Sequence, residues 1–178
     1  WKSSHYSESD KCIPTSFHHI CKHKAEKYIK NNSSYYYILR LGWIFSSKFS
    51  SKNHDFISKI LNVLKKNKNL TTNMIQKGIP TPTFLVDKVV QFIIKNPNLS
   101  STTLNVVSSG SAYRMEYISA IQDFFGTQSV IKGSKNFKRK AKVSNNETAT
   151  NEKLSKLIQE NILHWKESVS YTHLTLPT

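Results

Sequence analysis

A histidine, a lysine and a glutamate follow one another at intervals of four residues near the start of the chain, at His18, Lys22 and Glu26. On a helix, residues four apart lie on one face, so these three side chains would form a single row. A histidine ring can donate a proton near neutral pH, and a lysine one turn away places positive charge beside it. The spacing is compatible with His18 as a general acid and Lys22 as its charged neighbour. The alternative is a pair of side chains that point into solvent from a helix surface.

The same stretch contains side chains that can bind a metal, but their spacing does not match a complete metal-binding motif. His19 and His23 are four residues apart, which is the spacing of a helical zinc pair, and His18 and Cys21 lie beside them. No third ligand or helper glutamate follows in the arrangement of known zinc motifs. We therefore expect no metal here.

A helix must carry these side chains, and a strand must fix the helix in place. The helical pattern covers residues 17–30 and ends in an Asn/Ser turn at residues 31–34. Residues 35–45 (YYYILRLGWIF) are almost continuously apolar, which is typical of a parallel strand buried on both faces. We expect a central strand there, with helix 17–30 on one face and an amphipathic helix over residues 55–66 on the other.

The rest of the chain alternates between apolar runs and polar turns. Extended segments are expected at residues 70–75 and 103–107, and helices at residues 83–95, 113–125 and 151–161. Gly78, Pro80 and Pro82 exclude a regular element over residues 76–83. The basic segment 126–146 is expected to be an irregular loop.

Several short motifs recur in a fixed order along the chain. Their residues are Tyr6, Glu8 and Asp10; Pro14, Lys22 and Glu26; Leu39, Arg40 and Trp43; Gln76, Gly78, Pro80 and Thr81; Glu116 and Tyr117; and Ala141, Asn146, Lys153, Leu154, Trp165 and Glu167. In this order they resemble the dTDP-4-dehydrorhamnose reductase family of extended short-chain dehydrogenase/reductases, over its C-terminal half. The main departure is His18, which stands where the family has its catalytic tyrosine. Ile75, Val143 and Glu147 also replace family residues.

This resemblance implies an α/β fold, consisting of the C-terminal half of a Rossmann-like parallel sheet and a small α/β substrate-binding lobe. Residues 1–75, joined by residues 83–95, would belong to the dinucleotide-binding domain. Residues 76–167 would form most of the substrate-binding lobe. The phosphate-binding loop would lie outside this fragment, so the fragment alone is expected to be inactive.

The resemblance also implies a reaction, the transfer of hydride from NADPH or NADH to the 4-keto group of a nucleotide sugar. Lys22 would contact the cofactor and act with His18 in catalysis, while Trp43, Gln76 and Pro80 would bind the substrate. The alternative is a non-catalytic relative that binds a sugar nucleotide or a protein partner and has lost the catalytic tyrosine. A cytoplasmic protein, compatible with a homodimer, is expected.

Charge and composition exclude other classes of protein. The formal net charge of +15 suits a polyanion partner. However, the lysines are scattered, and arginine occurs only at Arg40, Arg114 and Arg139, so a nucleic-acid partner is not expected. Two cysteines do not make a disulfide framework. No apolar run approaches the roughly 20 residues that span a bilayer, so no membrane role is expected.

The last ten residues, 169–178 (VSYTHLTLPT), depart from the Lys/Asn/Ile-rich style of the rest. They resemble the translation of a sequencing adapter. We expect them to be a non-native tail without a helix or strand, unpacked against the protein.

Overall fold

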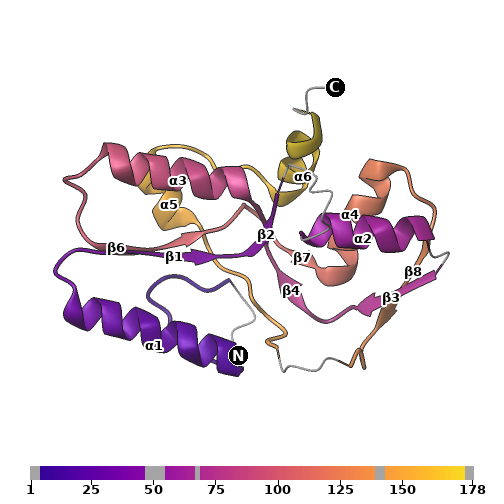
Figure 1. The fold of residues 1–178 in the computed structure, drawn as a ribbon, viewed down its shortest axis with the longest axis horizontal. Coiled ribbons are helices and arrows are strands. Elements are labelled where there is room, and N and C mark those ends of the chain that lie inside the picture. The colour runs from indigo at the N-terminus through magenta and orange to yellow at the C-terminus, as the bar shows by residue number, and fades with distance from the viewer. Residues whose placement is uncertain (1–4, 47–54, 67–68, 139–142, 175–178) are drawn as a thin grey trace.

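The computed structural model describes residues 5–46, 55–66, 69–138 and 143–174, which form a mixed α/β fold of small sheets and covering helices (Figure 1). Within these ranges, no helix combines the length and the apolar character that crossing a membrane requires. The predicted α/β class is confirmed. Two clusters of buried side chains hold the elements together.

The first cluster surrounds a parallel pair of strands, β1 (Tyr37–Leu41) and β6 (Thr102–Val106). In Figure 1, α1 (Phe17–Asn32) lies along one face of this pair, and α3 (Thr83–Lys95) and α5 (Glu152–Ile158) lie on the other. The buried side chains of this cluster are Leu85, Val89, Leu104, Val106, Leu154 and Ile158. Helices on both faces are what an apolar parallel strand requires.

The start and end of α1 follow from its flanking serines. Ser16 precedes the helix in an extended conformation, and its side-chain oxygen accepts a hydrogen bond from the backbone N–H of His19. This is a typical N-cap. At the other end, the backbone N–H of Ser33 donates to the Ile29 carbonyl. No side chain of α1 is fully buried, so its position depends on polar contacts.

The second cluster contains three helices, α2 (Phe56–Lys66), α4 (Arg114–Phe125) and α6 (Trp165–Leu174), and a second parallel pair, β3 (Asn69–Asn73) with β8 (Val130–Ser134). The buried side chains are Phe45, Ile57, Leu64, Ala112, Tyr117, Ile118, Ile121, Trp165 and Val169. The Tyr117 ring lies among several aromatic rings of this cluster.

Short strands connect the two clusters. β2 (Trp43–Phe45) pairs in parallel with β5 (Pro80–Pro82), and β4 (Lys77–Gly78) pairs antiparallel with β7 (Ala112–Tyr113). Gly42 separates β1 from β2. A Cβ atom at Gly42 would overlap the Ile79 carbonyl oxygen, so the close approach of the two backbones requires glycine.

The predicted strand over residues 35–45 needs two corrections. It is divided at Gly42, and each half pairs with a different strand. The helix expected on its second face, α2, packs instead against α4, because its apolar side chains Ile57 and Leu64 join the cluster around Tyr117. Helices α3 and α5 take the expected place of α2 (Figure 1).

Three segments expected to be irregular have regular structure. Residues 77–78 and 80–82, within the segment 76–83, form the short strands β4 and β5, because each pairs with a strand from a distant part of the chain. Residues 130–134, in the basic stretch, form β8, since the backbone of β3 supplies a hydrogen-bonding edge that composition does not reveal. The expectation of an unpacked tail is wrong for Val169, which is 2% exposed within α6. The Val169 side chain packs with Trp165 in the second cluster. Residues 175–178 of that tail lie outside the described residues.

The division into a dinucleotide-binding part and a substrate-binding part stays a prediction. The packing groups the elements differently from the sequence boundary at residue 75. β6 and α5 lie with β1, whereas α2 and β3 lie with α4. The predicted boundary at residue 75 thus passes through the second cluster, which combines Phe45, Ile57 and Leu64 with side chains after residue 110.

Candidate functional site

A cavity of about 410 Å³ lies at the carboxyl ends of β1 and β6. Its wall includes His19, Lys22, His23 and Glu26 from α1, Arg40, Leu41 and Gly42 from the end of β1, Asn105 and Val107 from the end of β6, and residues 10–15 and 146–149. Ligands of open α/β sheets bind at this end of the strands. The cavity is therefore the leading candidate site.

The structure brings Lys22 to this cavity and leaves His18 outside its wall. Both side chains are exposed on α1. His19, one residue further along, lines the cavity, and its ring lies 5.7 Å from the His18 ring. The predicted pair is therefore separated, and His19 is the histidine that shares the cavity with Lys22.

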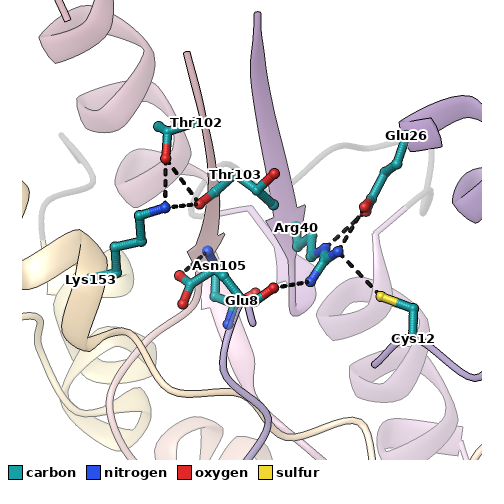
Figure 2. Close-up of polar contacts among 8 residues, drawn as sticks. All are labelled: Glu8, Cys12, Glu26, Arg40, Thr102, Thr103, Asn105 and Lys153. Atoms are coloured by element: carbon teal, nitrogen blue, oxygen red, sulfur yellow. Dashed lines mark hydrogen bonds and ion pairs between the residues drawn. The ribbon is translucent and has the colours of Figure 1, made fainter. Parts of the chain in front are cut away.

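An ion pair fixes α1 against β1. The guanidinium of Arg40 donates from Nε to Oε1 of Glu26 over 2.9 Å and from Nη2 to Oε2 over 2.7 Å (Figure 2). These hydrogen bonds hold the pKa of Glu26 below its ordinary value, against the opposite effect of burial. Lys22 lies one turn before Glu26, so the same ion pair positions Lys22 at the cavity.

The segment that precedes α1, residues 5–16, also contacts Arg40. Arg40 Nη2 lies 3.2 Å from Cys12 Sγ, and Arg40 Nη1 donates to the Glu8 carbonyl over 3.5 Å (Figure 2). The Glu8 carboxylate accepts the backbone N–H of Asn105, in β6, over 2.8 Å. Through Arg40, one side chain thus connects the segment, α1 and β1 around the cavity.

One group of potential metal ligands lies in this network. The ligand atoms of Cys12, His23 and Glu26 all lie within 4.8 Å of one another. Arg40 already donates to both oxygens of Glu26 and to the sulfur of Cys12. A metal cation would have to compete with that guanidinium for the same atoms. The arrangement fits a structural ion pair better than a metal centre.

Two polar atoms in the cavity wall are buried without a hydrogen-bond partner among the described residues, Thr15 Oγ1 and His23 Nδ1. Buried polar groups are usually satisfied, so each unpaired atom needs an explanation. A polar ligand in the cavity would supply partners for both. This observation favours a ligand that carries hydroxyl or amide groups.

Trp43 and Gln76 meet at a residue of the cavity wall, Glu147. The indole Nε1 of Trp43 donates to Glu147 Oε2 over 2.7 Å, and Gln76 Nε2 donates to the same oxygen over 3.3 Å. Neither Trp43 nor Gln76 lines the cavity itself. Pro80 is buried opposite Trp43 in the β2–β5 pair and does not line it either. Trp43 and Gln76 therefore reach the cavity only through Glu147.

The ring of Trp43 is itself held by the protein. The guanidinium carbon of Arg114 lies 3.7 Å from the Trp43 ring centroid and 4.8 Å from that of Phe56. This is a cation–π geometry. Since Arg114 covers the indole, Trp43 acts here as a support for Glu147.

A larger cavity, of about 1020 Å³, lies between α4, α6 and the loop after β3. Met74, Ile75, Tyr113, Phe124, Lys135 and Lys166 contribute to its wall. None of the predicted site residues is among its described lining. We therefore place the candidate site in the smaller cavity.

One protein family matches almost the whole chain. The family is described as the RmlD substrate binding domain, and the match covers residues 1–175. The chain belongs to this family. The resemblance drawn from the short motifs is thereby confirmed.

Solved structures share the fold of this RmlD-family chain. A dTDP-4-dehydrorhamnose reductase from Clostridium acetobutylicum is 22% identical, with a TM-score of 0.84 over 96% of this chain and 59% of that one. The dTDP-4-dehydrorhamnose reductase from Bacillus anthracis, solved in complex with NADP, is 17% identical, with a TM-score of 0.83 over 94% and 58%. MoeE5, in complex with UDP-glucuronic acid and NAD, is 15% identical, with a TM-score of 0.78 over 97% and 59%.

The chain thus spans about three-fifths of the length of these solved proteins. At this level of identity the likeness establishes a Rossmann-like reductase fold. No curated protein sequence matches the chain significantly.

Sequence reasoning missed Glu147 as a site residue of this RmlD-family chain. In the sequence, Glu147 stands out only as a departure from the family pattern. The one available signal was Trp43, because a partly buried indole N–H usually finds an acceptor. That acceptor is 104 residues away in the chain, so no local pattern could identify it.

Proposed function

We propose that this chain is part of an NAD(P)-dependent reductase that acts on the 4-keto group of a nucleotide sugar, as in the dTDP-4-dehydrorhamnose reductases. The observation that supports it most is the shared cavity of Lys22, His19 and Glu147 at the carboxyl ends of β1 and β6, in a chain of the RmlD substrate binding domain family. The solved relatives' complexes with NADP or NAD favour a nicotinamide cofactor. The choice between NADPH and NADH stays open.

The residues of the cavity fit such a cofactor and substrate. Lys22 would place positive charge and a hydrogen-bond donor beside the cofactor ribose. The unpaired atoms of Thr15 and His23 would find polar partners on a bound ligand. When bound, the cofactor supplies the hydride that reduces the 4-keto carbon.

The chain must then deliver a proton to the carbonyl oxygen, which gains negative charge during the reduction. His18 is the acid that family position suggests, and His19 is the acid that the cavity wall suggests. Each has an imidazole that can donate a proton near neutral pH. Lys22 would stabilise the developing charge on oxygen. Trp43, Gln76 and Pro80 are proposed to shape the substrate end of the cavity from behind Glu147.

The second candidate is a non-catalytic relative that binds a nucleotide sugar. Two observations favour it. His18 stands where the family has its catalytic tyrosine, and His18 lies outside the cavity wall. A homodimer and a cytoplasmic location stay predictions under either function.

Turnover of a dTDP-4-keto-6-deoxy sugar by the complete gene product, followed through NADPH or NADH oxidation, tests the proposal. Replacing the histidine that donates the proton, by His18→Phe or His19→Phe, should reduce turnover by roughly 10²–10⁴-fold. Lys22→Ala should weaken cofactor binding as well as turnover. Lys24→Ala, on the exposed side of α1, is the matched control and should change neither.

The outcome separates the two candidate functions. Turnover that only appears in His18→Tyr would indicate a copy that kept the scaffold and lost catalysis. A protein that binds neither a nicotinamide cofactor nor a nucleotide sugar, with or without His18→Tyr, would exclude both.

A further inference from the structure

Glu147 is a fixed carboxylate in the wall of the 410 Å³ cavity. Its Oε2 accepts hydrogen bonds from Trp43 and Gln76. Its backbone N–H donates to the Lys77 carbonyl over 2.8 Å, which holds the main chain beside β4. Within the described ranges, no hydrogen bond to its Oε1 is found. The carboxylate is thus oriented through one oxygen and has the other available to a ligand.

The chemistry of a carboxylate restricts what can bind beside it. When ionised it only accepts hydrogen bonds, and those from hydroxyl groups are short and strong. A second carboxylate would bring like charges together in a partly enclosed space, where water screens them less than in bulk. A diphosphate would meet the same repulsion directly beside Glu147, which favours an uncharged part of the ligand at this point of the wall.

We propose that Glu147 is a specificity-determining residue, which accepts a hydrogen bond from a sugar hydroxyl and rejects sugars that carry a carboxylate. This inference rests on the proposed binding of nucleotide sugars in this cavity. It assigns the selection between neutral and acidic sugars at this site to one side chain. Trp43 and Gln76 are the positioning residues, since they act on the substrate through Glu147.

The preference for the neutral sugar would come as much from repulsion between Glu147 and the carboxylate of the acidic sugar as from the hydrogen bond to the neutral one. A site discriminates by the difference between two binding free energies, and an unfavourable charge contact with one ligand is enough to create that difference. Removing the negative charge of Glu147 should therefore relax the selection mainly by improving the binding of the acidic sugar.

The test measures the affinities of the complete gene product for dTDP-glucose and dTDP-glucuronic acid by calorimetry. The two ligands share the nucleotide and differ only at C6 of the sugar. The wild-type protein should bind dTDP-glucose at least about tenfold more tightly. Glu147→Gln keeps the size of the side chain and should bring the two affinities within about threefold of each other. Asp87→Asn removes one negative charge from the exposed side of α3 and should keep the wild-type preference.

The outcomes distinguish a failure of the role of Glu147 from a failure of the proposed nucleotide-sugar binding. Equal affinities in the wild-type protein, or an unchanged preference in Glu147→Gln, would overturn the role of Glu147 and leave nucleotide-sugar binding intact. If the wild-type protein binds neither ligand, the proposed function fails together with this inference. Glu147→Ser removes the same charge by a smaller side chain and must give the same loss of preference, even if Glu147→Gln lowers the melting temperature.

Discussion

Arg40 and Glu26 join β1 to α1 by two parallel hydrogen bonds, of 2.9 and 2.7 Å, from one guanidinium to one carboxylate. Both side chains are about one-fifth exposed, so solvent screens the pair only partly. No side chain of α1 is fully buried. This ion pair is therefore a main attachment of the helix that carries Lys22.

Glu26→Gln should destabilise the protein by about 1 kcal/mol at neutral pH, because it removes the charge from a two-pronged hydrogen bond with Arg40. Chemical denaturation measures this change in the free energy of unfolding. Glu160→Gln is the control, because Glu160 pairs with Lys88 at a site where both are about half exposed, and it should cost less than about 0.5 kcal/mol.

The contribution of Glu26 should depend on pH in a defined direction. Its pKa in the folded protein is lowered from 4.5, so the ionised form is favoured by folding. The stabilisation is present above the unfolded pKa and is lost as the pH falls through the lower folded pKa. The stability difference between wild type and Glu26→Gln should therefore shrink below pH of about 4. A difference that grows on acidification would contradict the ion pair.

Tyr117→Phe should leave the protein as stable as before or stabilise it by up to about 1 kcal/mol. The hydroxyl of Tyr117 is buried and has no hydrogen-bond partner among the described residues, so its removal loses no bond. Thermal and chemical denaturation at neutral pH measure the effect. A destabilisation above about 1 kcal/mol would show that the phenol oxygen has a partner.

The buried phenol of Tyr117 should also make the protein less stable at alkaline pH. Burial raises the pKa of Tyr117 well above its ordinary value of 10.0, so folding favours the neutral phenol. Above about pH 10, the phenol of the unfolded chain releases a proton that the folded protein keeps. The free energy of unfolding then falls by up to about 1.4 kcal/mol per pH unit. The difference between Tyr117→Phe and wild type should grow by this amount above pH 10.

The fold could be predicted from the sequence where local patterns match packing. Helix 17–30 was recognisable from its helical pattern and from the Asn/Ser turn that ends it. The strand over residues 35–45 was recognisable from its apolar run, but its division was not. That division depends on the approach of the Ile79 backbone to Gly42, a contact between distant parts of the chain.

The candidate site was only partly predictable for the same reason. Lys22 and His19 line the cavity, while His18 lies outside its wall. The roles assigned to His18, Lys22, Trp43, Gln76 and Pro80 stay predictions. Glu147 and Arg114 had no local signal, since each contacts Trp43 from a distant segment.

Val169→Ala should destabilise the protein by about 1–3 kcal/mol, because it leaves a cavity in the cluster around Trp165. Ser170→Ala, at the exposed next position of α6, should change stability by less than about 0.5 kcal/mol. Chemical denaturation of the two variants measures both. If Val169→Ala costs no more than Ser170→Ala, the segment from Val169 onward does not pack against the protein, whatever its origin.

The last prediction concerns Gly78, which faces the ring of Trp43. A Cβ atom at Gly78 would overlap the indole atoms Cε2 and Cζ2, so Gly78→Ala must displace the ring that hydrogen-bonds to Glu147. Overpacking of this kind costs about 1–3 kcal/mol. In the protein with Trp43→Ala, the same change should cost far less, because the ring that it meets is gone. A double-mutant cycle by chemical denaturation measures this coupling.

Gly126→Ala supplies the control for that cycle. Gly126 has a φ of 63° at the end of α4, and an added Cβ would meet no atom within 4 Å. Its substitution should cost about 1 kcal/mol from backbone strain alone, equally with and without the Trp43 ring. If Gly78→Ala is as independent of Trp43 as Gly126→Ala is, then the indole does not occupy the position that supports Glu147. In that case Gly78→Ala would also leave the preference for dTDP-glucose over dTDP-glucuronic acid unchanged.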